Sequence, residues 1–167
     1  MAELTALESK IGEVLGLAMA AQGATEKVGK LVEDEGNHGD LRQALERMHK
    51  EAMEAEERTT GLAENLEGKK TAILEKARET KQEATEMMST YLGNDADALD
   101  GFEFLTMAEA GEVGHWRIVG KMNERGRLPG LQQIVDWATP IQERHLEDTL
   151  QAALKLAAKE DPNEPES

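Results

Sequence analysis

Apolar residues recur at steps of three and four over almost the whole chain, and this spacing constrains the fold more than any other feature. The pattern begins with Leu7, Ile11, Val14 and Ala18, while Glu and Lys take many of the intervening positions. Residues at such steps share one face of an α-helix. The spacing therefore predicts a helix over 3–33 with its apolar face towards a core.

The same spacing predicts four further helices, separated by segments rich in Gly, Asn, Asp and Pro. They cover about 41–68, 69–92, 98–125 and a last stretch that begins near 131. Segment 69–92 would be about 36 Å long at ~1.5 Å per residue, enough to carry the chain back along a bundle. We therefore expect an all-α protein, a four-helix bundle with an additional crossover helix between the second and third bundle helices.

Two local features predict how the later helices end or bend. Gly126 is suited to the left-handed conformation that closes a helix, and Pro140 predicts a bend or a break in the last helix. The acidic, proline-containing residues 160–167 are expected to form a disordered tail after a single helical domain over 1–159.

Charge and composition narrow the classes of partner. The 167 residues include 34 Asp and Glu against 19 Lys and Arg, a net charge of −15. This balance argues against binding nucleic acid or an anionic membrane and favours a cation. Without cysteine, only oxygen and imidazole remain as strong metal ligands. With an acidic N-terminus and no apolar run of about 20 residues, a soluble cytoplasmic protein is expected.

The segment 108–116 is the strongest candidate for a site. Glu109, Glu112 and His115 follow one another at steps of three, beside the apolar residues Phe102 and Trp116. Carboxylates on an inward helix face are costly unless they are paired or bind a metal. The spacing therefore predicts a polar site inside the bundle.

Other polar residues are expected at matching levels of the two predicted hairpins. In an antiparallel helix pair, residues equally far from the turn lie side by side. This places Gln22 or Glu26 level with Glu46 and His49, and Glu109 and Glu112 level with Gln142, Glu143 and His145. Carboxylates and imidazoles on facing helices are how a four-helix bundle holds a metal, although 34 acidic residues also produce such alignments by chance.

The helix order, the helical crossover, the Glu46-x-x-His49 pair and Val113-Gly114-His115-Trp116 together resemble the ferritin-like superfamily, particularly its YciE/YciF branch, over about residues 4–158. The resemblance implies a carboxylate- and histidine-bound di-metal centre, usually of iron, often a dimer, and an association with stress responses. Some positions depart from that pattern. Gln22 stands where a glutamate is usual. Gly114 precedes His115 and Arg117 follows two residues after it, where the branch has acidic neighbours. Gln142 replaces the glutamate of a Glu-x-x-His pair.

Two hypotheses follow. In the first, the bundle binds one or two iron or manganese ions, with oxygen, peroxide or stress-related chemistry, and a homodimer is expected. The expected metal ligands are Glu26, Glu46, His49, Glu109, Glu112, His115, Glu143 and His145. In the second, the protein is a non-catalytic helical stress or scaffold protein whose ancestral site is degraded. An enzyme without metal has little support, because no phosphate loop, nucleophile motif or Rossmann pattern is found.

Overall fold

The computed structural model describes residues 2–166 and contains five α-helices in this part of the chain. They are α1 (Ala6–Glu35), α2 (Gly39–Glu64), α3 (Lys70–Tyr91), α4 (Ala98–Gly126) and α5 (Leu131–Ala157). No strand occurs within 2–166. The predicted all-α class is confirmed, and the predicted boundaries lie close to those observed.

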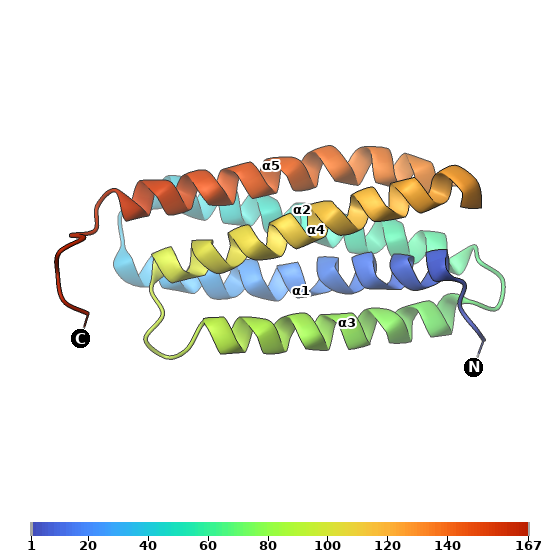
Figure 1. Cartoon of the computed structure of the whole chain (residues 1–167), viewed down its shortest axis with the longest axis horizontal. Helices are drawn as coiled ribbons and strands as arrows, with labels where there is room; N and C mark the ends of the chain where they lie inside the picture. The colour runs from blue at the N-terminus through green and yellow to red at the C-terminus, as the bar shows by residue number, and fades with distance from the viewer. Residues whose placement is uncertain (1, 167) are drawn as a thin grey trace.

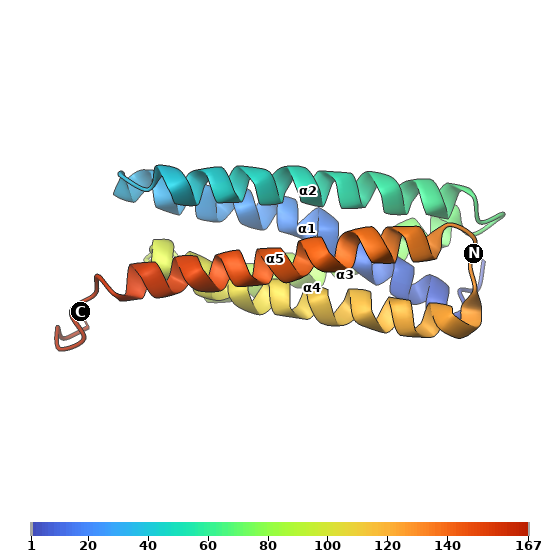
Figure 2. The ribbon, with the colours of Figure 1, turned by 90° about the horizontal axis from the view of Figure 1, so that it is seen from above.

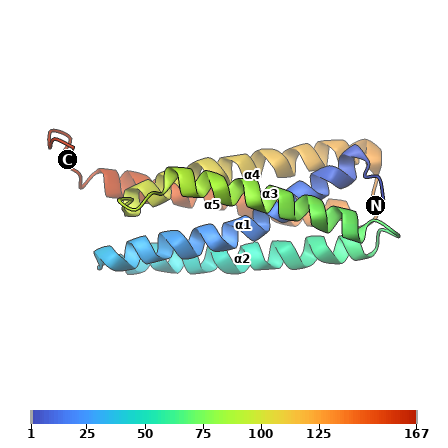
Figure 3. The ribbon, with the colours of Figure 1, turned by 90° about the horizontal axis from the view of Figure 1, so that it is seen from below.

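The helices lie side by side along one long axis. Successive helices run in opposite directions, so α2 and α4 point the same way, and α3 brings the chain back between them (Figure 1). Viewed from above, α2 and α1 form one layer and α5 and α4 the next (Figure 2). From below, α3 lies outermost (Figure 3), and only Ala72, Ile73 and Ala77 of this helix are buried. None of the helices described has both the length and the apolar content needed to cross a membrane.

The hydrophobic core consists of two clusters along the bundle. The first gathers around Ile11, Leu15, Ile73, Trp116 and Leu131, near the start of α1. The second gathers around Val28, Leu45, Phe102, Leu105 and Leu156, near the end of α1. A group of buried polar side chains lies at the level between them, part-way along the hairpins as the sequence predicts.

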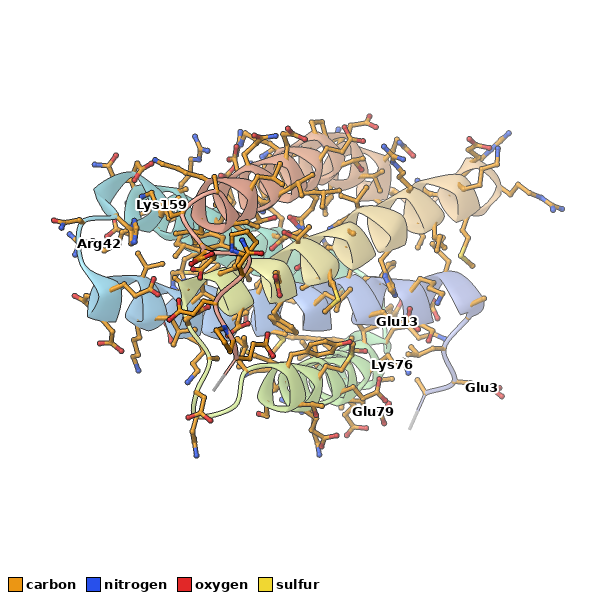
Figure 4. All side chains as sticks on the ribbon, turned by 60° about the vertical axis from the view of Figure 1, so that its left-hand side comes forward. Glu3, Glu13, Arg42, Lys76, Glu79 and Lys159 are labelled. Carbon is orange, nitrogen blue, oxygen red and sulfur yellow. The ribbon has the colours of Figure 1, made fainter. Side chains whose placement is uncertain are left out.

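Two glycines allow α3 to pack closely on α1. A Cβ added at Gly12 would lie 2.8 Å from Cβ of Lys76 on α3 (labelled in Figure 4). A Cβ added at Gly16 would overlap the carbonyl oxygen of Ala77. Three further glycines, Gly111, Gly114 and Gly120, lie within α4. Of these three, only Gly120 makes a close contact, whereas an added Cβ at Gly111 or Gly114 would meet no atom within 4 Å.

We expect Gly16→Ala to lower the free energy of unfolding by about 1–3 kcal/mol, because the added methyl group forces α1 and α3 apart. Gly23→Ala is the matched control on the same helix, since its Cβ would meet no atom within 4 Å. That change should raise the stability by up to about 1 kcal/mol through helix propensity. Denaturant unfolding of both variants measures the difference, and equal effects would contradict close α1–α3 packing.

The predicted end of α4 is wrong. The left-handed residue after α4 is Arg127, with φ 49°, rather than Gly126. Of the bend or break predicted at Pro140, the break does not occur, since α5 continues through this proline. Proline removes the donor to the carbonyl of residue Asp136, and because Asp136 is exposed, water can satisfy that oxygen instead. Residues 158–166 form turns and irregular chain, and the last residue of the expected tail lies outside the described residues.

Candidate functional site

Five polar side chains meet between α2, α4 and α5, and we call them the central polar cluster: Glu51, Glu109, Glu112, Gln142 and His145. Glu109 and His145 are only 1% and 3% exposed, and Glu112 and Gln142 are also buried. Each comes from a helix position at three- or four-residue steps from core residues, so helix periodicity carries it inward with the apolar stripe. The sequence predicted the convergence of Glu109, Glu112, Gln142 and His145, because the short turn between α4 and α5 fixes their level.

His145 lies between two carboxylates. Its Nδ1 is 3.6 Å from Oε2 of Glu109, and its Nε2 is 3.3 Å from Oε1 of Glu51. The other oxygen of Glu51 accepts a hydrogen bond from Arg144. The two ring nitrogens therefore face different acids, one at the centre of the bundle and one near its α2–α5 edge.

The two acids of α4 are poorly compensated. Oε2 of Glu109 is buried without a hydrogen-bond partner, since 3.6 Å is too long for a hydrogen bond to His145. Glu112 accepts a hydrogen bond from the amide of Gln142. Burial and the neighbouring charge of Glu109 raise the pKa of Glu112 well above its usual value, although the hydrogen bond from Gln142 acts in the opposite direction. This pair of acids therefore favours a proton or a cation beside it.

The donor chemistry of the cluster suits a metal, although its arrangement is not that of a ready-made site. A cavity of about 10 Å³ is lined by all five members, and a space of this size holds about one water molecule. Oxygen and imidazole donors suit iron and manganese. Among residues 2–166, however, no three His, Asp or Glu side chains are placed to enclose one ion. Binding there would require side chains to move towards the cavity.

The residues expected from the α1–α2 hairpin do not join this cluster. Nδ1 of His49 lies 3.2 Å from the hydroxyl of Thr25 and 3.2 Å from the carbonyl oxygen of Gln22. Its Nε2 is 3.8 Å from Glu26, which is exposed like Glu46. The expectation that Glu46 and His49 share the interior site is wrong, because this face of α2 turns towards α1 and solvent.

His115 and Glu143 also lie apart from the cluster. Nδ1 of His115 is 2.8 Å from the carbonyl oxygen of Gly111, and its Nε2 is 3.6 Å from Glu13 of α1. Glu143 forms an exposed ion pair of 2.7 Å with Arg117. Of the eight expected ligands, the structure brings together Glu109, Glu112 and His145.

Glu51 is the member that the sequence reasoning missed. It follows Met48 by three residues and precedes Ala55 by four, so it continues the buried stripe of α2. That spacing indicates an inward position for Glu51, whereas the sequence interpretation favoured the Glu46-x-x-His49 motif on the adjacent face of the same helix. Comparison with protein-family models, with curated proteins and with solved structures gave no match.

Proposed function

We propose that the protein is a ferritin-like bundle, with α3 as its crossover helix, that binds a divalent transition-metal ion beside Glu109, Glu112 and His145. The observation that carries this proposal is the buried oxygen of Glu109, which has no hydrogen-bond partner. A buried carboxylate without a partner is costly, and a bound cation would compensate it. The adjacent acid Glu112 and the small cavity between them add to this support.

Each residue would have a distinct role. Glu109 and Glu112 would neutralise the ion, and Nδ1 of His145 would donate a lone pair to it. Glu51 accepts from the opposite ring nitrogen, an arrangement that commonly orients a metal-binding histidine. The amide of Gln142 positions Glu112. Iron and manganese suit these donors, and such ions would supply redox or Lewis-acid chemistry when bound.

A second candidate is a structural bundle whose central acids hold a proton instead of a metal. The amides of Gln22 and Gln142 favour it, because each donates a hydrogen bond to a glutamate, Glu56 and Glu112 respectively, and adds no charge. The lack of a three-residue metal cluster in the described part of the chain is also consistent with this candidate. In this case the protein would act through its surface or as a scaffold.

Metal uptake distinguishes the two candidates. Protein stripped with chelator is dialysed against Mn²⁺ or Fe²⁺ without oxygen, and bound metal is measured per chain. We expect binding by the parent and almost none by Glu109→Gln/Glu112→Gln. The control Glu26→Gln/Glu46→Gln removes the same charge from exposed acids and should bind like the parent, with a metal-dependent rise in melting temperature.

The proposal is contradicted if the parent binds no metal, or if both double variants lose binding equally. The first result would support the structural candidate. The second would show that cations collect on the acidic surface, which has a net charge of −15, without using the buried pair.

A further inference from the structure

A larger cavity, separate from the one inside the central polar cluster, lies between α1, α3 and α4. Its volume is about 270 Å³, and small residues leave the space: Ala20, Ala24, Ala84, Ala108 and Gly111. Here the C-terminal half of α3 is mostly exposed, so this helix covers the space loosely. Large apolar side chains, including Met88 and Phe104, complete its walls. The cavity is therefore mainly apolar.

One side of this cavity is acidic. Glu109 and Glu112 both line it. The buried Oε2 of Glu109 lies 3.6 Å from Nδ1 of His145, so this oxygen belongs to the central polar cluster. No Lys or Arg is found among the described residues that line it, and His115, which also lines it, has its Nε2 3.6 Å from Glu13 of α1. An anionic amphiphile such as a fatty acid would place its charge beside two acids. A cationic amphiphile would pair with the two acids. The space extends over α4 at Gly111, because an added Cβ there would meet no atom within 4 Å.

We propose that this cavity binds a small hydrophobic amine, with its apolar body between α1, α3 and α4 and its ammonium group against Glu109 and Glu112. An apolar cavity of about 150 Å³ holds benzene, so 270 Å³ accommodates an aromatic ring with a short side chain. The ammonium group supplies the positive charge that the acid pair lacks. This inference does not rest on the metal proposal, and a metal ion would compete with the amine.

The test is calorimetric titration of the metal-free protein, in chelator, with three probes of similar shape. They are 2-phenylethylamine, the neutral 2-phenylethanol and the anionic 3-phenylpropionate. We expect the amine to bind at least about tenfold more tightly than the alcohol, and the acid not to bind, because only the amine forms a charge-assisted hydrogen bond. Saturating Mn²⁺ should weaken the amine if the metal proposal also holds.

Three variants locate the binding. Glu109→Gln should reduce amine affinity to that of the alcohol and leave the alcohol unchanged. Glu103→Gln, an exposed acid on the same helix, should change neither. Gly111→Leu fills the space without adding strain to the helix and should remove binding of both probes.

Several results would overturn the proposal. These are equal affinity for all three probes, amine binding that survives Gly111→Leu, or no binding by the parent. Sedimentation of the parent and Gly111→Leu is measured in parallel. If the parent binds no amine and Gly111→Leu disrupts an oligomer, a second copy of the chain covers this face instead. Failure of metal uptake with retained amine binding would reject only the metal proposal.

Discussion

Replacing Gln142 with leucine is expected to lower the free energy of unfolding by about 3 kcal/mol in metal-free protein. The amide of Gln142 donates to Glu112, and both side chains are buried between α4 and α5. Without that donor, the carboxyl group of Glu112 would join Glu109 in having a buried oxygen without a partner. Loss of one member of a buried polar pair costs more than loss of both, because the remaining group stays desolvated.

A double variant separates the pair from simple packing. Gln142→Leu/Glu112→Leu should recover most of the lost stability, since no polar atom of the pair remains in the core. Gln133→Leu, on an exposed turn of the same helix, should change the stability by less than about 0.5 kcal/mol. Denaturant unfolding in chelator measures all three variants. If the double variant is as unstable as Gln142→Leu, the hydrogen bond does not explain the loss.

The sequence predicted the α4–α5 part of the cluster correctly because a short turn joins two uninterrupted helices. Glu109 then lies level with His145, and Glu112 level with Gln142, by distance from the turn alone. This reasoning requires only helix periodicity and the position of the turn. Pro140 did not disturb the level, because α5 continues through it.

The same reasoning failed on α2 because each bundle helix has two neighbours. Distance from the turn gives the level of His49 relative to α1, but not which neighbour its side chain faces. His49 and Glu51 are about 200° apart round the helix at ~100° per residue, so one faces Thr25 of α1 and the other faces His145 of α5. Contacts between α2 and α5 join helices distant in the sequence. No turn between them fixes the register.

The buried acids connect the proposals. A proton, a metal ion and an ammonium group each compensate the charge of Glu109 and Glu112, so they should exclude one another. Occupancy would then depend on pH, on metal concentration and on amine concentration. Because the acids line both cavities, one pair of residues joins the interior of the bundle to the apolar space under α3.

Glu112→Gln is expected to stabilise the metal-free protein increasingly as the pH rises above about 4.5. The pKa of Glu112 is raised in the folded state by burial and by Glu109, so the unfolded chain loses this proton first. In the parent, the contribution of Glu112 is therefore complete below its unfolded pKa and is lost as the pH rises towards the folded pKa. Glutamine keeps the shape of the protonated acid and cannot ionise. The stability difference should grow by up to roughly 1 kcal/mol per pH unit in this range.

Comparison of the variant with the parent at each pH isolates this residue from acids that act in the opposite direction. Burial raises the pKa of Glu8, but hydrogen bonds from Thr5 and the charge and hydrogen bond of Lys69 lower it overall, so Glu8 contributes stability that is lost as the pH falls. That contribution is common to both proteins and cancels in the difference.

Denaturant unfolding between pH 4 and 8, in chelator, gives the two curves. Glu46→Gln, an exposed acid, should give a curve parallel to that of the parent. A constant difference between Glu112→Gln and the parent across this range would show that Glu112 is ionised in the folded bundle, and its charge would then require a partner other than a proton.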